Sequence, residues 1–599
     1  MDDEGRMENY LKRLEPTEEV ETESAQKRKR ERSVVWDHFK KSSDKAYGIC
    51  NYCGKHLKTA GNTSNLLDHL KRLHPSRMTA DKEPMPKTMA TFLNKEPFYG
   101  SDSNVKKRLD KKVMDMIVKD VRPFSCVHDE GFVELMQEAV PRYKLPSRTY
   151  FRDVMLPTEY DLLSLKLRAA LEAVKHVGLT TDLWTSAANE GYITITCHFI
   201  TENFKLTSAL LSTAPLMTPT NHNAQNIADS ISLMLAKWGL LSKVVTVTTD
   251  NDSTMKKACD ILEFKHLPCL AHTINLLAQD ILKLAAVNVI ISKCKRIVTY
   301  FKHSTIATAK LKEAQNTNEP LLLIQEVSTR WNSAYAMVKR ILQINEYVTL
   351  TLLKLRNGPS PITNEELDVL NDLSDLLSPF HEATLSVSTN TKVSVSLIIP
   401  VIAEIHHKMN QVKAQLRTQE GKKIYVVVQK RLVERLDSFE THTIPRIATL
   451  IDPRFKKDGF LRSSNAEQAA EALELELLSL EPTTPRRPPT PESTLNEASS
   501  KFSFLQNKPK VKSTRADATR QFMENENIPD TCDPLKYWEM TADNELKLVA
   551  KKFFCVQASS CESERVFSLA GQTISDRRTR LKPEVVDQLL FLNKNRHFN

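Results

Sequence analysis

The spacing of hydrophobic residues along the chain changes near residue 178. From 106 to about 150, apolar residues recur at helical spacing. Beyond that point, short β-branched or apolar runs and one strictly alternating segment are typical of strands. The pattern predicts strands at 178–184, 191–199, 206–213 and 243–248, with an amphipathic helix at 223–238 before the last strand. Three consecutive strands, a helix and another strand predict an α/β sheet.

The remainder of the chain is mostly helical in its spacing, with one interruption. Residues 271–409 have a helical pattern, and helices return at 534 and continue to 591. Between them, 481–491 is rich in Pro, Thr and Arg, a composition that does not pack, and its Thr-Pro steps are candidate phosphorylation sites. Residues 1–32 lack apolar periodicity and are expected to be disordered.

Four metal-ligating residues stand near the N-terminus with the spacing Cys-x2-Cys-x15-His-x4-His. They are Cys50, Cys53, His69 and His74. A two-residue gap lets both thiolates reach one ion from a tight turn, and two histidines five apart complete the shell from one helical face. We therefore expect a closed tetrahedral Zn²⁺ site. Its helix should follow the turn at 61–64.

Composition places this zinc module in a multidomain globular protein. The chain has 599 residues, too many for a single core, with 41% hydrophobic and 26% charged residues. A net charge of +10 favours polyanionic partners. The ten cysteines are scattered and no signal peptide is expected, which argues against a disulfide framework. No apolar run approaches the roughly 18 residues that a membrane span needs, so no membrane partner is expected.

A short basic cluster precedes the zinc module, at Lys27, Arg28, Lys29 and Arg30. Such a cluster is typical of a nuclear import signal or of an arm that contacts phosphates, and the alternative is a solvated charge run. Beside a zinc finger, nuclear import is the favoured interpretation, and it places the protein in the nucleus.

Two carboxylates are predicted at the ends of neighbouring strands. Asp182 is expected to end the first strand, and Asp250 ends the strand at 243–248. Joined by a third carboxylate from a distant helix, they could hold two divalent cations about 3.5–4 Å apart for phosphodiester chemistry. Oxygen ligands suit Mg²⁺ or Mn²⁺. The alternative is that both residues cap helices, which acidic residues at strand ends commonly do.

Several segments, in a fixed order over residues 33–595, resemble the hAT superfamily of DNA transposases with a BED-type zinc finger. The finger contributes Trp36-Asp37-His38-Phe39, the two Cys and the two His. The remaining matches are Thr181-Asp182-Leu183-Trp184-Thr185, Thr249-Asp250-Asn251, Cys269-Leu270-Ala271-His272, Arg330-Trp331, Asp452-Pro453-Arg454-Phe455-Lys456, Ser563-Glu564-Arg565-Val566-Phe567-Ser568, Asp576-Arg577-Arg578 and Leu590-Phe591-Leu592-Asn593.

The resemblance implies an RNase H-like α/β core interrupted by a large helical insertion. It implies that Asp182, Asp250 and Glu564 bind Mg²⁺ or Mn²⁺, with Glu564 preferred to nearby Glu562, for DNA cleavage and strand transfer. Asp252 departs from the family pattern, and it either perturbs this site or caps the next helix.

The resemblance also assigns roles outside the carboxylates. It implies that Trp331 stacks on an unpaired base and that Arg330 contacts phosphate, and the alternative for Trp331 is an anchor in the helical core. Cys269 and His272 are expected to support the active site structurally, because no second ligand pair stands nearby.

The chain is thus expected to be multidomain, α/β and α, in seven parts. These are a disordered basic arm at 1–32, the BED-type finger at 33–76, a linker at 77–105, a helical segment at 106–158, the first part of the RNase H-like core at 159–285, the helical insertion at 286–545 with a disordered loop near 464–530, and a C-terminal hAT dimerisation region at 546–599 that completes the core.

Double-stranded DNA is the expected partner. The predicted contacts from the finger are Asn62, Ser64, Asn65, Lys71 and Arg72, although a structural or protein-binding finger is an alternative. The apolar face of 585–592 is expected to form a homodimer or higher oligomer, the alternative being packing inside the chain.

Two functions follow. The favoured one is a nuclear, zinc-dependent, sequence-specific DNA-binding protein derived from a hAT transposase, acting as a dimer in transcription regulation. The alternative is an active transposase. A scaffold without DNA contact fits the basic finger poorly.

Overall fold

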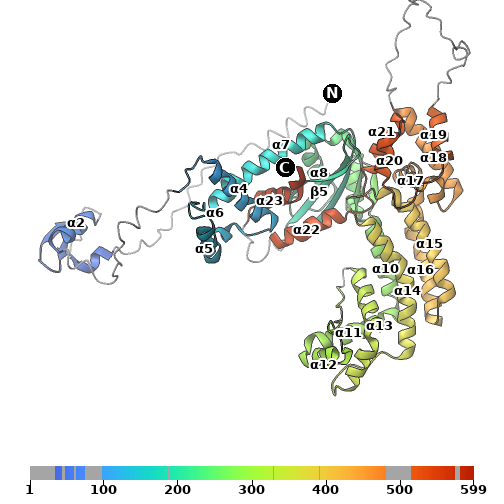
Figure 1. The fold of residues 1–599 in the computed structure, drawn as a ribbon, viewed down its shortest axis with the longest axis horizontal. Coiled ribbons are helices and arrows are strands. Elements are labelled where there is room, and N and C mark those ends of the chain that lie inside the picture. Colours follow the sequence, from blue (N-terminus) through green and yellow to red (C-terminus); the bar gives the residue numbers. More distant parts are fainter. Residues whose placement is uncertain are drawn as a thin grey trace, which may run out of the picture. The chain divides into compact units, whose positions relative to one another are not determined.

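The computed structural model describes residues 34–42, 47–59, 63–74, 98–185, 189–327, 330–389, 391–480, 515–573 and 581–598. The chain divides into two compact units, Met1–Pro97 and Phe98–Asn599, which are described one at a time (Figure 1). The basic cluster at 27–30, the 481–491 segment and Asn62 lie outside the described residues.

The first unit is a small antiparallel sheet with one helix. Strands β1 (Phe39–Lys41), β2 (Tyr47–Cys50) and β3 (His56–Lys58) pair in that order, and helix α2 (Ser64–Leu73) follows. Leu66 and Leu70, four apart on α2, are buried against Phe39 and Cys50 of the sheet. Because this apolar core is so small, a metal ion is expected to supply much of the stability.

The second unit is built on a five-stranded mixed sheet. Its strands are β4 (Val177–Thr185), β5 (Gly191–Ile200), β6 (Leu206–Pro215), β7 (Val244–Thr249) and β8 (His266–Pro268), in the spatial order β6-β5-β4-β7-β8. The first three strands are antiparallel, and β4, β7 and β8 run parallel. This is the RNase H-like sheet that the resemblance implied.

Helices cover both faces of this sheet, and for that reason every residue of β5 is buried. Residues of α7 (Leu156–Glu172), α8 (Ala224–Trp238) and α9 (Ser253–Ile261) share one core with the sheet. Helix α22 (Cys561–Thr573) packs against β4 and β5, and it shares a separate cluster with Leu210 of β6 and with α23 (Pro583–Asn595).

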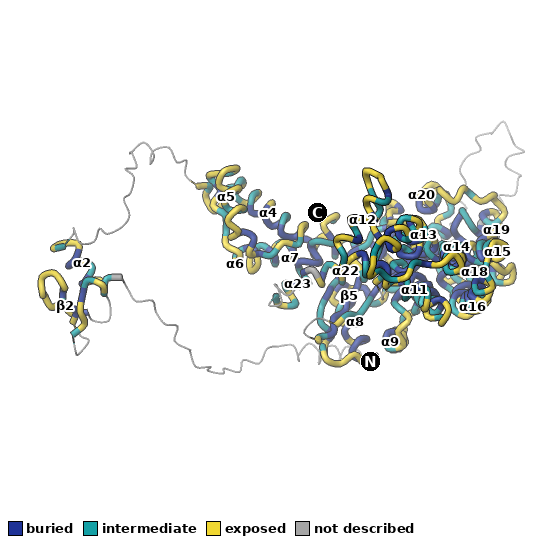
Figure 2. The backbone as a smooth tube through the Cα atoms, turned by 90° about the horizontal axis from the view of Figure 1, so that it is seen from below, coloured by how far each residue is buried: buried dark blue, intermediate teal, exposed yellow. Residues whose placement is uncertain are grey.

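The long helical insertion follows β8. It comprises α10 (Leu270–Leu282), α11 (Ala285–His303), α12 (Thr305–Gln315), α13 (Trp331–Leu353), α14 (Asn364–Val387), α15 (Ile398–Gln415), α16 (Gln419–Arg435), α17 (Thr443–Leu450), α18 (Ser463–Ser479), α19 (Arg515–Glu524), α20 (Pro534–Met540) and α21 (Asn544–Phe554). Most of its buried apolar residues belong to one core cluster, and buried stretches are the dark blue tube segments in Figure 2.

Before the sheet, α4 (Asn104–Lys119), α5 (Glu130–Ala139) and α6 (Arg148–Tyr150) form the helical segment expected at 106–158. No single helix in the described ranges is long and apolar enough to cross a membrane; α10 and α11 reach that length and composition only as a pair bent by 92°.

The structure corrects the expected disordered loop near 464–530. Helix α18 occupies its beginning, and α19 lies near its end. Ala466, Ala469, Leu473 and Leu477 recur at helical spacing and are buried, so this stretch packs in the core. The Pro-rich composition of 481–491 is confined to that segment and does not describe the helical residues before and after it. The strand β8, only three residues long, was not predicted.

The apolar face of α23 lies inside the second unit. Val586 and Leu590 pack with α22, and Leu589, Phe591 and Leu592 belong to the core of the sheet. The apolar face of α23 therefore packs inside the chain, which was the alternative to a contact between subunits.

Candidate zinc and carboxylate sites

The four predicted zinc ligands converge in the finger. Cys50 ends β2, Cys53 lies in the turn after it, His69 lies on α2 and His74 directly follows this helix. Their ligand atoms all lie within 4.8 Å of one another, and Cys53 Sγ is 3.3 Å from His69 Nε2. Gly54, with φ +70°, closes the turn by donating its N–H to the Cys50 carbonyl at 2.9 Å.

The hydrogen bonding of His74 and the pKa of His69 are both consistent with coordination of a cation. His74 Nε2 is buried and makes no hydrogen bond, a cost that coordination to a metal would remove. Burial and the neighbouring His74 lower the pKa of His69, which favours the neutral imidazole that ligates metals. Four protein ligands with no open position are typical of a structural Zn²⁺ site.

Helix α2 presents a polar outer face. Ser64, Asn65, Lys71 and Arg72 are exposed, whereas His69 and Leu70 face the sheet. The Asn65 side chain donates to the Lys58 carbonyl at 3.3 Å, which ties the start of the helix to β3.

The sheet brings two carboxylates to one edge. The parallel pairing of β4 with β7 ends at Thr180 and Thr248, Asp182 lies two residues beyond it, and Asp250 directly follows β7. Asp182 does not end its strand, which corrects the position expected from the sequence. β4 continues to Thr185 because it stays paired with β5.

The third carboxylate reaches the same place from α22. Burial first, and then the charges of Asp250 and Glu564, raise the pKa of Asp182 to about 8. A carboxyl whose pKa is raised by two neighbouring carboxylates is typical of a cation site without its cation. The charges of Asp250 and Glu564 are thus near enough to act on Asp182, but in the described part of the chain only the finger ligands gather within 4.8 Å of one another, so the three acids do not stand at coordination distances. Their oxygen donors suit Mg²⁺ or Mn²⁺.

Residues around Asp250 have structural partners. Asp252 accepts hydrogen bonds from the N–H groups of Thr254 and Met255 and caps α9, which settles the alternative left open by the sequence. Thr249 Oγ1 donates to the Asp250 carbonyl at 2.8 Å and lies 2.8 Å from His266 Nε2. These contacts fix the backbone that carries Asp250.

Cys269 is a structural residue at the junction of the core and the insertion. Its buried Sγ accepts from the N–H of His272 at 3.4 Å and from that of Ser560 at 3.3 Å. Burial raises the pKa of this thiol to about 12. Cys269 thus holds the start of α10 against the segment that leads into α22, in agreement with the supporting role expected for it.

The two glutamates at the start of α22 have different surroundings. Glu562 forms ion pairs with Arg565 and Lys594, both at 3.2 Å. The charge of Glu564 instead contributes to the raised pKa of Asp182. The geometry therefore favours Glu564 as the third carboxylate.

Trp331 begins α13 and is 3% exposed. Its ring packs near Tyr335 and edge-on to His381 of α14, so in this structure it is an anchor of the helical core, the alternative to base stacking. Arg330, just before the helix, is exposed. Base stacking by Trp331 stays a prediction and requires its ring to leave this packing.

Polar side chains of α23 bind the outer edge of β6. Asn595 accepts from the Leu210 N–H at 2.9 Å and donates to its carbonyl at 2.7 Å, and Asp587 accepts from the Thr213 N–H at 2.6 Å. The sequence patterns assign no role to Asp587, Asn595 or Lys594, and Arg565 belongs to them only as part of the motif at 563–568. The partners of Asp587 and Asn595 lie hundreds of residues away, and only the eight-residue spacing of these two residues indicates a shared helix face.

Fold and sites define the class: a zinc finger protein with an RNase H-like core and a helical insertion. Four families match segments of the chain, namely the BED zinc finger at 33–75, the ZBED1 RNase-like domain at 180–273, the ZBED1 RNase-like helical domain at 267–376 and the hAT family C-terminal dimerisation region at 517–596. The chain is a BED-type zinc finger protein of the hAT transposase superfamily.

Its relatives include both zinc finger proteins and transposases. It is 25% identical to human zinc finger BED domain-containing protein 4 over 94% of this chain and 52% of that one, and 25% identical to human zinc finger BED domain-containing protein 6 over 82% and 55%. A putative AC transposase of Zea mays is 23% identical over 95% and 76%. The chain spans about half of the length of the two human relatives. These matches support a DNA-binding protein derived from a hAT transposase.

Proposed function

We propose that the protein is a nuclear, zinc-dependent, sequence-specific DNA-binding protein that acts as a dimer in transcription regulation. The observation that carries this proposal is the finger, in which four converging metal ligands lie beneath a helix with a polar exposed face.

The finger would contact DNA through α2. A metal ion bound by His69 and His74 would tie the helix to Cys50 at the end of β2 and to Cys53 in the following turn, and would thereby fix which side chains face outward. Lys71 and Arg72 suit phosphate contacts, which give affinity. Ser64 and Asn65, together with Asn62, suit base edges, which give sequence discrimination.

Nuclear import and dimer formation extend this proposal. The basic cluster at 27–30 is the proposed import signal, and the net charge of +10 favours a polyanionic partner. The hAT dimerisation region at 517–596 supports self-association, which would present two fingers to one DNA site. Since the apolar face of α23 is internal, the dimer would use the outer surface of this region. Light scattering of the full chain should then give twice the monomer mass.

Selection from a random pool of double-stranded DNA tests the finger directly. The full chain should enrich a shared motif, and Cys50→Ser should lose both bound zinc and the motif. Cys532→Ser replaces an exposed cysteine of the second unit and serves as the matched control. A motif retained by Cys50→Ser, or no motif with the wild-type chain, would sink the proposal.

A second candidate function, an active transposase, is supported by the convergence of Asp182, Asp250 and Glu564. These three residues would hold Mg²⁺ or Mn²⁺, which activates a nucleophile and stabilises the leaving oxygen of a phosphodiester when bound. In the same scheme Arg330 binds phosphate, and Trp331 stacks on an unpaired base once it has left its packing.

A cleavage assay with candidate element ends and Mg²⁺ or Mn²⁺ separates the two functions. An active transposase nicks this DNA, and Asp182→Asn abolishes the activity while leaving binding by the finger intact. If the wild-type chain binds the DNA but never cuts it, the second candidate is excluded and the first stands.

A further inference from the structure

We infer that Arg565 is a positioning residue that fastens the helix of Glu564 to the end of α14, so that the carboxylate set is complete only while the helical insertion is docked. The inference rests on the proposed carboxylate site. It concerns a residue that touches none of the three acids by a described contact and acts through α22.

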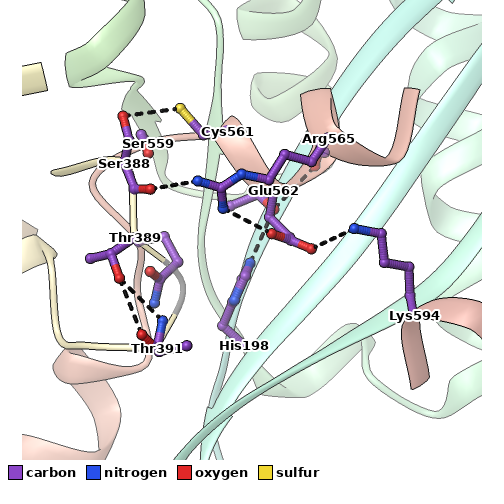
Figure 3. A network of polar contacts seen from close by, with 12 residues as sticks. His198, Ser388, Thr389, Thr391, Ser559, Cys561, Glu562, Arg565 and Lys594 are labelled. Carbon is purple, nitrogen blue, oxygen red and sulfur yellow. Dashed lines mark hydrogen bonds and ion pairs between the residues drawn. The ribbon is translucent and has the colours of Figure 1, made fainter. Parts of the chain in front are cut away.

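Arg565 joins two elements that are far apart in the sequence. Its Nη2 donates to the Ser388 carbonyl at the end of α14 at 2.7 Å, and its Nη1 lies 3.2 Å from Glu562 Oε2 (Figure 3). The guanidinium therefore bridges the start of α22 and the C-terminal end of an insertion helix. A cation is favoured there because the last carbonyls of a helix carry partial negative charge.

Further contacts hold the same junction. Ser559 Oγ donates to the Val387 carbonyl at 2.9 Å. Cys561 Sγ lies 3.5 Å from Ser388 Oγ (Figure 3). On the other side, Lys594 of α23 lies 3.2 Å from Glu562 Oε1. The Glu562 side chain is only 11% exposed, so this carboxylate needs both of its cationic partners.

These contacts set the rotation of α22. Residues three apart share a helix face, whereas residues two apart lie about 200° from each other around the axis. Glu562 and Arg565 therefore fix one side of the helix, and Glu564 is turned to the other side, towards Asp182. A rotation or shift of the first turn would move the Glu564 carboxylate away from Asp182 and Asp250.

Helix α14 also carries a contact to the residue predicted to meet DNA. His381, about two turns before Ser388, lies with its ring centroid 6.3 Å from that of Trp331 and 4.9 Å from that of Tyr335. One helix thus connects the surroundings of Trp331 with the bridge at Arg565, and displacement of α14 at one end would reach Glu564 at the other.

The alternative is that Arg565 is an exposed cation that does not influence the carboxylate site. Its side chain is 47% exposed, and ion pairs at that exposure contribute about 0–1 kcal/mol. The two interpretations differ in what Arg565→Ala does to metal binding at a site that Arg565 does not ligate.

Terbium luminescence of the full chain provides the readout. Trp184 lies two residues beyond Asp182 on β4, hence on the same face, and its ring packs near Phe567 of α22. Excitation through Trp184 should sensitise Tb³⁺ bound at the carboxylates, and Mn²⁺ should displace it. The difference between wild type and Asp182→Asn defines the signal from this site.

Arg565→Ala should weaken the affinity for Tb³⁺ about 10-fold, the lower end of the loss seen when a residue that orients a metal ligand is removed, because Arg565 acts on Glu564 only through the position of α22. Arg565→Lys keeps the charge but cannot make both contacts, and should give a partial loss. Arg152→Ala removes an exposed arginine paired with its neighbour Asp153 and should change nothing. Hydrogen exchange of the α22 backbone should quicken in Arg565→Ala and stay unchanged in β7.

If Arg565→Ala binds Tb³⁺ within twofold of wild type, the inference about Arg565 is overturned, whereas the proposed carboxylate site is not. This holds even if the α22 backbone exchanges faster, because the bridge would then have only a structural role. A wild-type chain that binds Tb³⁺ no better than Asp182→Asn overturns the carboxylate site as well.

Discussion

Asp182 on strand β4 and Asp587 on helix α23, which contacts strand β6, show how burial changes a carboxyl group in two settings. At Asp182, the neighbouring Asp250 and Glu564 add to burial. At Asp587, burial raises the pKa to about 6 although the Thr213 N–H and the Ser212 hydroxyl donate to the side chain. The first environment suits a cation, whereas the second joins a helix to a strand.

Asp587 should make the stability of the second unit depend on pH. Its pKa in the folded chain lies above the 3.8 of an unperturbed Asp, so the folded state holds the proton more tightly. The resulting stabilisation is complete below about pH 3.8 and is lost as the pH rises through about 6. Asp587→Asn keeps an acceptor for Thr213 and removes the charge. We therefore expect the variant to be more stable than wild type at pH 8, by at most about 3 kcal/mol, and to lose this advantage towards pH 4.

Thermal denaturation at several pH values measures the effect, with Asp229→Asn, on the exposed face of α8, as the control. A Tm difference between Asp587→Asn and wild type that is the same at pH 5 and pH 8 would contradict the assignment.

The role of a site residue could be predicted from the sequence where its partners stand only a short distance away in the chain. Cys50, Cys53, His69 and His74 stand at fixed short spacings, so their pattern alone indicated a metal site, and the structure brings the four together. Asn595 could not be recognised, because its partner Leu210 is 385 positions away and the interaction exists only once α23 lies on β6.

At the scale of elements, the strands β4 to β7 agree with the sequence patterns to within about two residues. Alternation and β-branched runs mark strands that are long and buried. The three residues of β8 are too few to show a period. Helices α18 and α19 were missed because the composition of 481–491 dominated the interpretation of its neighbours.

Helix α2 is the element whose outer face the proposed function depends on most. Replacing Lys71 and Arg72 by Ala should weaken binding to all DNA sequences alike. The slope of log Kobs against log salt concentration should fall by about 0.9 for each phosphate that the variant no longer neutralises. Fluorescence anisotropy over a salt series measures both the affinity and this slope.

The matched control replaces Lys422 and Lys423, an adjacent exposed pair on α16. An equal loss of slope in the control would assign the effect to net charge, and an unchanged slope in the finger variant would remove α2 from the DNA interface.

At the scale of the whole molecule, the chain combines a finger unit with a core unit that retains all three candidate carboxylates. The order of motifs in the sequence already indicated the RNase H-like core, its insertion and the C-terminal region, because each motif is a local feature. The packing of α23 was left open by the sequence, since a helix face of Val586, Leu589 and Leu590 suits a partner subunit and an internal core equally well. Only the position of β6 and α22 decides between them.

Chromatin occupancy of the full chain, mapped in cells, tests whether the finger directs this protein to specific DNA in the nucleus. The proposed function predicts discrete sites that share one motif, and their loss in Cys53→Ser at equal protein level and nuclear amount. Sites that persist in Cys53→Ser, or a wild-type chain that occupies no defined sites, would contradict it.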